Sequence, residues 1–155
     1  MEKTLDIRGI TLMENRSFMF DGKIVAMQRP RTAKNGHVYV PLETKRAERD
    51  IRKAYERKYK GCAPFTGAVK IEIQIFRHMT KEIAKSKKKI MDVQYGLIKP
   101  ATKPDLSNMI KTVEDALNGV AYRDDAQITS IKASKRYCYY PLEMDYANII
   151  ISQDE

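Results

Sequence analysis

The sequence predicts an α+β fold in which a mixed sheet of about four to five strands packs against two main helices. This prediction rests on a strictly alternating apolar segment at residues 69–76, an amphipathic segment at residues 105–118, and β-prone runs toward both ends of the chain. A chain of 155 residues is long enough to bury one core, so we expect a single domain over residues 1–155.

The first part of the chain combines short extended segments with one charged helix. Residues 4–12 and 18–27 carry β-prone side chains around turn signals and predict two strands. Residues 37–41 predict a short extended piece after a basic loop. Thr44 is a suitable N-cap, so we expect a helix over residues 45–60.

One amphipathic helix dominates the second part of the chain. Pro104 blocks a helix before it, Asp105 is a suitable N-cap, and Gly119 ends it. At about 100° per residue, its apolar and polar side chains fall on opposite arcs. The apolar arc consists of Leu106, Met109, Ile110, Val113, Ala116, Leu117 and Val120. The polar arc consists of Ser107, Asn108, Lys111, Glu114, Asp115 and Asn118. Residues 127–137 and 143–152 then predict two strands.

The composition argues against several classes of protein. No run of about 18 apolar residues exists to span a membrane, and the first residues lack the apolar core of a secretory signal, so we expect a cytoplasmic protein. Cys62 and Cys138 are too few and too far apart for a disulfide framework or a thiolate metal site. His37 and His78 have no partner at ligand spacing and are interpreted as structural. We expect no small-molecule cofactor.

The charge balance favours a polyanionic partner. Lys and Arg outnumber Asp and Glu by 29 to 20, which gives a net charge of +9, and phosphates neutralised by such cations release condensed counterions. The candidate phosphate-binding residues are Arg29, Arg31, Lys34, Lys85, Lys87, Lys88, Lys89 and Lys103. Residues 85–94 predict either a short basic helix or a mobile loop. Acidic residues gather instead from Asp105 to Asp125, and an acidic centre in a basic frame suits a metal-dependent phosphodiesterase.

The acidic residues that could bind such a metal flank the amphipathic helix. Asp105 lies at its start, and Asp124 and Asp125 follow its far end. A helix of about 14 residues is roughly 20 Å long, so the fold or a second subunit must bring these acids together. From the helix itself, Lys111 could steady a phosphate or a leaving oxygen.

The remaining polar and aromatic candidates have weaker assignments. Asn108 and Asp115 share the face of Lys111 and could support the site from a second shell or form an ordinary helical network. Tyr137, Tyr139 and Tyr140 are interpreted as core and edge packing rather than as a base-stacking platform.

Three linked blocks of sequence resemble the signature of RusA-type Holliday junction resolvases. They are Lys-Pro-Asp-Leu-Ser-Asn-Met-Ile-Lys at 103–111, Glu-Asp-Ala-Leu-Asn-Gly at 114–119 and Asp-Asp-Ala-Gln-Ile at 124–128. The family pattern is K-P-D-x-D-N-x-x-K, then D-A-L, then D-D-x-Q, and the spacing agrees throughout. Weaker similarities at residues 29–31, 38–41 and 86–89 extend the resemblance over most of the chain.

The resemblance implies a RusA-like nuclease domain over residues 1–155. The family consists of small homodimeric endonucleases, often from phages or prophages, that need Mg²⁺ and nick four-way junctions symmetrically in DNA recombination and repair. By this match, Asp105 and Asp125 bind the metal, Lys111 is the catalytic lysine, and Asp124 supports Asp125. We expect branched DNA as the substrate, a homodimer as the assembly, and Mn²⁺ as an alternative to Mg²⁺.

One position departs from the family pattern, because the second acid of the first block falls at Ser107. A hydroxyl is a far weaker metal ligand than a carboxylate. Glu114 could supply the missing charge, Asp115 could do so, or the site binds metal weakly and the protein retains junction binding while losing rate. We expect retained activity with help from Glu114 or Asp115.

Two alternatives to a junction resolvase remain at this stage. Ser107 favours a non-catalytic protein that recognises junctions on the same scaffold. The other alternative is a metal-dependent nuclease for flap or single-stranded DNA. Neither requires a different fold.

Overall fold

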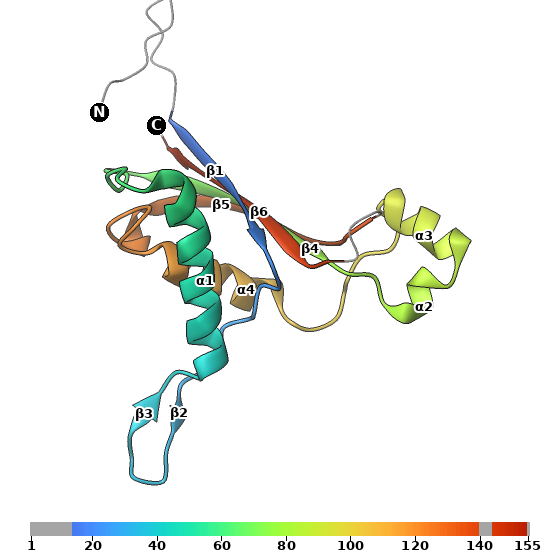
Figure 1. Ribbon diagram of the computed structural model, residues 1–155, viewed down its shortest axis with the longest axis horizontal. Helices are drawn as coiled ribbons and strands as arrows, with labels where there is room; N and C mark the ends of the chain where they lie inside the picture. Colours follow the sequence, from blue (N-terminus) through green and yellow to red (C-terminus); the bar gives the residue numbers. More distant parts are fainter. Residues whose placement is uncertain (1–13, 140–143, 155) are drawn as a thin grey trace, which may run out of the picture.

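The computed structural model describes residues 14–139 and 144–154, and Figure 1 shows the arrangement of its elements. In chain order these are β1 (Asn15–Asp21), β2 (Arg31–Thr32), β3 (Val38–Tyr39), α1 (Leu42–Tyr59), β4 (Val69–Arg77), α2 (Lys81–Ala84), α3 (Lys87–Gln94), α4 (Leu106–Leu117), the short 3-10 helix η1 (Asp125–Gln127), β5 (Ile128–Tyr137) and β6 (Tyr146–Gln153). The predicted α+β class is confirmed.

Within the described residues, four strands form a mixed sheet in the order β1-β6-β4-β5. The central strand β4 pairs antiparallel with β6 and parallel with β5. The alternation predicted for residues 69–76 is confirmed, because Val69, Ile71, Ile73 and Ile75 point into the core. Strands β2 and β3 form a separate ribbon that projects from the body in Figure 1.

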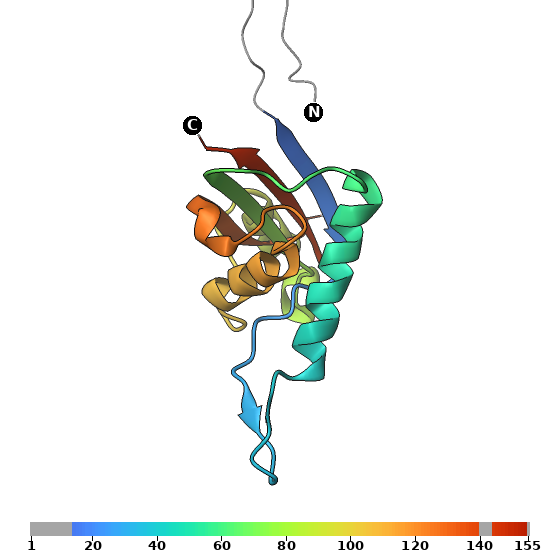
Figure 2. The same cartoon turned by 90° about the vertical axis from the view of Figure 1, so that its left-hand side faces the viewer.

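Helices α1 and α4 lie side by side over one face of the sheet, as Figure 2 shows. Ile51 and Tyr55 of α1 and Met109 and Val113 of α4 belong to one core cluster with side chains of the strands. Thr112 lies on neither predicted arc of α4, yet it is fully buried. Its hydroxyl donates a hydrogen bond of 2.7 Å to the carbonyl oxygen of Val25, which satisfies this buried polar group. The apolar face of α4 thus packs against the core, and its polar face lies outside the core.

The strand predicted over residues 18–27 ends earlier than expected. Strand β1 stops at Asp21, where Gly22 adopts a φ of +150°. The chain then runs toward α4, and the backbone N–H of Met27 donates to the carbonyl oxygen of Asn108 at 2.9 Å. The strand predicted over residues 4–12 lies outside the described residues.

The cap predicted for the first helix is wrong. Helix α1 begins at Leu42 with Pro41 at the N-cap position, and Thr44 lies inside the helix. Its hydroxyl is buried and accepts a hydrogen bond from the backbone N–H of Gln28 at 3.4 Å, so tertiary contact rather than capping accounts for this threonine.

The later elements follow the prediction more closely. Asp105 occupies the N-cap position of α4, and β5 covers nearly the whole predicted strand. Residues 85–94 contain the helix α3, so the helical alternative is confirmed, and the additional turn α2 precedes it. Strand β6 begins at Tyr146, while residues 140–143, with Tyr140, lie outside the described part. In the part of the chain that the structure describes, no helix is long and apolar enough to cross a membrane.

Candidate active site

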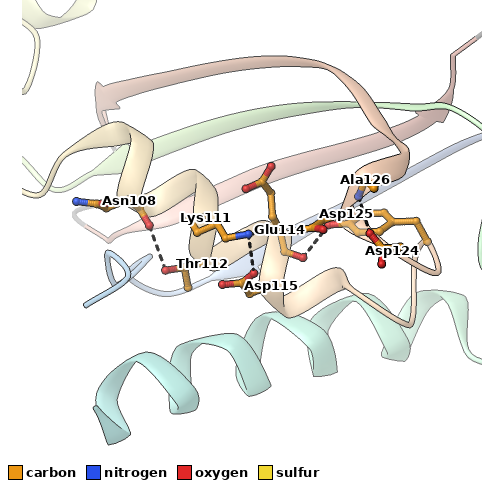
Figure 3. Close-up of polar contacts among 9 residues, drawn as sticks. Asn108, Lys111, Thr112, Glu114, Asp115, Asp124, Asp125 and Ala126 are labelled. Atoms are coloured by element: carbon orange, nitrogen blue, oxygen red, sulfur yellow. Dashed lines mark hydrogen bonds and ion pairs between the residues drawn. The ribbon is translucent and has the colours of Figure 1, made fainter. Parts of the chain in front are cut away.

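The centre of the candidate site is one lysine held between two carboxylates. The Nζ atom of Lys111 lies 2.9 Å from Oδ2 of Asp125 and 3.1 Å from Oδ1 of Asp115 (Figure 3). Lys111 and Asp115 are one turn apart on α4, whereas Asp125 reaches them from the turn before β5. The ammonium of Lys111 therefore forms ion pairs with two acids from different segments of the chain.

The charges of this cluster influence each other strongly. The hydrogen bond to Asp125 raises the pKa of Lys111, against the opposing effect of burial, so the lysine stays protonated. In return, the hydrogen bond and charge of Lys111 lower the pKa of Asp125. Burial raises the pKa of Glu114, and burial followed by the charge of Asp115 raises the pKa of Glu48 on α1. Acids around the pair thus differ in how readily they lose a proton.

The turn that carries Asp125 is fixed by a capping box. Oδ1 of Asp124 accepts from the N–H of Ala126 at 2.8 Å, and Oε1 of Gln127 accepts from the N–H of Asp124 at 3.0 Å. The Nε2 atom of Gln127 donates to the carbonyl oxygens of Phe65 and Gly67, each at 2.9 Å. This amide therefore ties the turn to the segment that enters β4.

The end of α4 is fixed from two sides. From α1, Arg52 donates through Nε to the carbonyl oxygen of Ala116 and through Nη2 to that of Asn118, both at 3.0 Å. The buried hydroxyl of Tyr122 donates to the carbonyl oxygen of Glu114 at 2.7 Å. The bonds from Arg52 satisfy carbonyls that a helix end leaves without intrahelical partners, whereas the carbonyl of Glu114 also accepts from the backbone N–H of Asn118. Together these bonds hold the turn of the helix that carries Asp115.

The opposite end of α4 is organised differently. Nζ of Lys135 donates to the carbonyl oxygens of Thr102 at 2.7 Å and Pro104 at 2.9 Å. Nη1 of Arg77 donates to the carbonyl oxygen of Lys103 at 3.1 Å. The backbone that precedes Asp105 is thus anchored to β4 and β5. The Asp105 side chain itself is exposed and caps no backbone N–H of the described chain.

The described residues contain no preformed cluster of the predicted metal-binding acids. Asp105 precedes α4, whereas Asp124 and Asp125 follow it, and Asp125 folds back to Lys111 near the middle of the helix. Among the described residues, no group of three or more His, Cys, Asp or Glu side chains is arranged to hold a metal ion. The sequence left open whether the fold of one chain or a second subunit joins Asp105 to Asp124 and Asp125, and a joined site remains a prediction.

The pair around Lys111 nevertheless fits a hard divalent cation. Mg²⁺ prefers oxygen ligands and commonly takes only one or two carboxylates from the protein, together with water and substrate phosphate. Asp115 and Asp125 already surround one positive charge, the ammonium of Lys111. The chemistry of this donor set therefore fits Mg²⁺.

The other predicted residues of α4 lie around this pair. Ser107 and Asn108 are exposed on the first turns of the helix, and the carbonyl oxygen of Asn108 accepts a hydrogen bond from the Thr112 hydroxyl at 3.3 Å (Figure 3). Glu114 is half-buried, close enough for Lys111 and Asp125 to influence its pKa. Glu114, three residues after Lys111, thus interacts electrostatically with the cluster, and Ser107 lies one turn before Lys111 on the same helix.

The predicted phosphate-binding residues form two extensions of the body. Arg29, Arg31 and Lys34 are exposed on the β2–β3 ribbon and the segment before it. Lys85, Lys87, Lys88 and Lys89 belong to the α2–α3 region, where Lys89 pairs with Glu82. Lys103 is exposed just before α4. In Figure 1 the two extensions project from different parts of the body.

Several residues that shape the site were not identified from the sequence. Glu48 and Arg52 are four residues apart on α1, beside the buried Ala47 and Ile51. Each directly follows a buried residue of α1, so their positions beside the apolar stripe could have indicated that they face the neighbouring helix. Gln127 is the glutamine of the D-D-x-Q block, but its backbone contacts to Phe65 and Gly67, like those of Lys135 to Thr102 and Pro104, follow from no local pattern.

Comparison with known proteins gives two matches. Residues 21–141 match the family described as Endodeoxyribonuclease RusA. The chain is also 35% identical over 132 residues to a protein of Bacillus subtilis (strain 168) named "Uncharacterized protein YqaN", a match that covers 83% of this chain and 92% of the relative. Both matches include the segments that contain Lys111 and the acids at the two ends of α4.

Proposed function

Because the chain belongs to the RusA endodeoxyribonuclease family, we propose that it is a Mg²⁺-dependent endonuclease that resolves Holliday junctions by paired phosphodiester hydrolysis in DNA recombination and repair. The observation that carries this proposal is the lysine shared by Asp115 and Asp125 on the exposed face of α4. The whole chain, residues 1–155, acts as one nuclease domain in this proposal.

The residues of the site have distinct roles in this proposal. Asp125 and Asp105 hold the metal, with Mn²⁺ as a substitute for Mg²⁺, and Asp115 adds charge beside Asp125. A bound ion of this kind activates water and neutralises charge on the phosphate. Lys111 stays protonated, and its ammonium turns from the carboxylates to donate hydrogen bonds to the phosphate oxygens as negative charge develops. Asp124 keeps Asp125 in place through its hydrogen bond to Ala126.

A homodimer meets two needs of this reaction. Cutting two opposed strands requires two sites, which a symmetric pair of subunits provides. A second copy can also supply Asp105, since within one chain no group of three or more described His, Cys, Asp or Glu side chains is arranged to hold a metal ion. In this arrangement each site takes Asp125 from one subunit and Asp105 from the other.

Subunit mixing tests this arrangement directly. Two differently tagged chains, Asp105→Asn and Asp125→Asn, are co-expressed and the heterodimer is purified through both tags. A shared site predicts that the heterodimer regains one intact site and nicks one strand of a junction, whereas each variant homodimer leaves it uncut. A heterodimer as inactive as its parents would contradict the shared site.

The position of Ser107 calls for a second source of negative charge, which we assign to Glu114. Nicking of a four-way junction is measured with Mg²⁺ and with Mn²⁺ for the parent, Glu114→Gln and Ser107→Asp. We expect Glu114→Gln to cut more slowly and Ser107→Asp to cut at least as fast as the parent. If Glu114→Gln matches the parent, Glu114 does not compensate.

The main alternative is a junction-binding protein without catalytic activity, which Ser107 favours. Four-way, flap, duplex and single-stranded DNA are compared as substrates with Mg²⁺, with Asp125→Asn as the control. Paired nicks confined to the four-way junction and lost in Asp125→Asn are expected. Tight junction binding without cleavage supports the alternative, and preference for flap or single-stranded DNA points to a different nuclease activity on the same fold.

A further inference from the structure

A hollow of about 490 Å³ lies where α3 and the following loop meet the ends of β4, β5 and β6. This region is far along the sheet from the turn of Asp125 in Figure 1. We call it the aromatic hollow because its lining includes five aromatic side chains, which are Phe76, Tyr95, Tyr137, Tyr139 and Tyr146. None of these residues belongs to the candidate active site.

Four of the rings in the hollow form two groups, a stacked pair and two exposed rings. Phe76 and Tyr146 stack on each other, with ring centroids 4.6 Å apart and planes 10° from parallel. Tyr95 and Tyr139 are 70% and 48% exposed, so much of each ring contacts solvent. The sequence favoured core and edge packing for Tyr139, but a tyrosine exposed to this extent contributes little to a core. Its ring remains available to a ligand.

The charge of the hollow has one sign. Lys99 and Arg136 line it, and among the described residues no carboxylate does. The lysines of α3 lie close by in the chain, one or two turns before its end. Rings that offer flat faces, combined with cations that hold phosphate, are the elements with which proteins bind single-stranded nucleic acid.

We propose that the aromatic hollow binds an unpaired nucleobase of the DNA strand, which stacks on Tyr95 and Tyr139 while Lys99 and Arg136 contact the adjoining phosphates. This proposal rests on the proposed function, because a branch point is where a junction offers a base that can leave the helical stack. Stacking of this kind does not depend on base identity, so the hollow recognises DNA structure rather than sequence.

The connection between the hollow and α4 gives this site a place in the reaction. Lys99 is followed within six residues by Asp105. Six residues span at most about 20 Å, so Lys99 at the edge of the hollow lies within that distance of the start of α4. The segment between them is anchored by Lys135 and Arg77, which makes the spacing reproducible.

The test measures binding apart from cleavage. The probes are a short single-stranded oligonucleotide and a four-way junction, each with one 2-aminopurine, placed at the branch point in the junction, and Ca²⁺ replaces Mg²⁺. The variants are Tyr95→Leu and the double variant Tyr95→Leu/Tyr139→Leu. Tyr95→Phe retains a ring, and Met91→Ala removes an exposed side chain of α3 outside the hollow. Circular dichroism and thermal unfolding check that each variant is folded.

We expect 2-aminopurine fluorescence to change on binding to the parent and to Tyr95→Phe, and this change to be lost in the double variant. The affinity of the double variant should fall by about tenfold, since loss of one stacked base weakens binding roughly fivefold to a hundredfold. Met91→Ala should bind like the parent. Unchanged fluorescence and affinity in the folded double variant would overturn the proposal. A change in oligomeric state instead of DNA affinity would also overturn it, because the hollow would then be a contact between subunits.

The two proposals can fail separately. If the parent cuts junctions and the double variant binds them equally well, the hollow has no role in DNA binding while the nuclease function stands. If 2-aminopurine stacks in the hollow but the parent cuts no substrate with Mg²⁺ or Mn²⁺, the base-binding site stands and the nuclease function fails.

Discussion

Predicted metal-binding acids precede and follow α4, but their side chains have different surroundings. At the far end, Asp125 is bonded to Lys111, and its turn is fixed by the side chain of Gln127. At the near end, the anchors Lys135 and Arg77 contact backbone carbonyls and leave the Asp105 carboxylate exposed.

The two carboxylates therefore differ in how their position and charge are fixed. Asp125 is held ionised by a neighbouring cation inside the same chain, so its position is set before any ligand arrives. Asp105 has a fixed backbone and an exposed side chain, which suits a carboxylate that completes a site with another subunit or with DNA. Substitutions at the far end of α4 are therefore expected to have larger effects on junction nicking than substitutions at the near end.

The largest effect is expected for Asp125→Asn. This substitution removes the negative charge that pairs with Lys111 and, in the proposed mechanism, a metal ligand, so junction nicking should fall by at least about 100-fold. Nicking of a labelled junction measures the rate, and Asp50→Asn, an exposed acid on α1, is the matched control. Nicking within a few-fold of the parent would remove Asp125 from the mechanism.

Gln127→Met should have the next largest effect. The substitution removes the donors to Phe65 and Gly67 and the acceptor for the turn of Asp124, so unfolding free energy should fall by about 1–3 kcal/mol. Denaturant unfolding measures this loss, and nicking should fall by about tenfold because the Asp125 turn loosens. Gln127→Glu keeps the acceptor for Asp124 but turns a carboxylate oxygen toward the carbonyl oxygens of Phe65 and Gly67, so it should be at least as destabilised as Gln127→Met. Equal stability of all three proteins would show that the amide does not hold the turn.

Lys135→Met tests the near end of α4. It removes the bonds to the carbonyl oxygens of Thr102 and Pro104, and we expect a loss of about 1 kcal/mol in unfolding free energy and a several-fold slower nicking rate. Lys132→Met, on the same strand with an 83% exposed side chain, is the control. If both variants behave alike in nicking, anchoring of the segment before Asp105 does not matter to the reaction.

The smallest expected effect is a change in the titration of Asp125. Lys111→Met removes the cation that lowers the pKa of Asp125, so this pKa should rise toward its ordinary value in a carboxyl-carbon NMR titration. The parent pairing stabilises the fold above the unfolded carboxyl pKa, and that contribution disappears as pH falls through the lowered folded pKa. In Lys111→Met the Asp125 part of this acid dependence should vanish. An unchanged pKa would show that Lys111 is not its main cause.

The sequence by itself determined the local elements and the kinds of residue in the site. The 2-residue period of residues 69–76 and the two arcs of α4 predict a half-buried strand and an amphipathic helix, because side-chain periodicity follows directly from backbone geometry. The linked blocks around Asp105, Lys111 and Asp125 were sufficient to suggest the family, which the match over residues 21–141 confirms.

Which of those residues meet depends on the tertiary structure. It pairs Asp115 and Asp125 with Lys111, leaves Asp105 at the other end of α4, and brings Glu48 and Arg52 of α1 beside the cluster. It also makes Thr44 a buried hydrogen-bonding residue and Tyr139 an exposed ring. The physical reason is that these outcomes depend on packing between segments far apart in the chain, and spacing along a sequence carries no information about such distances.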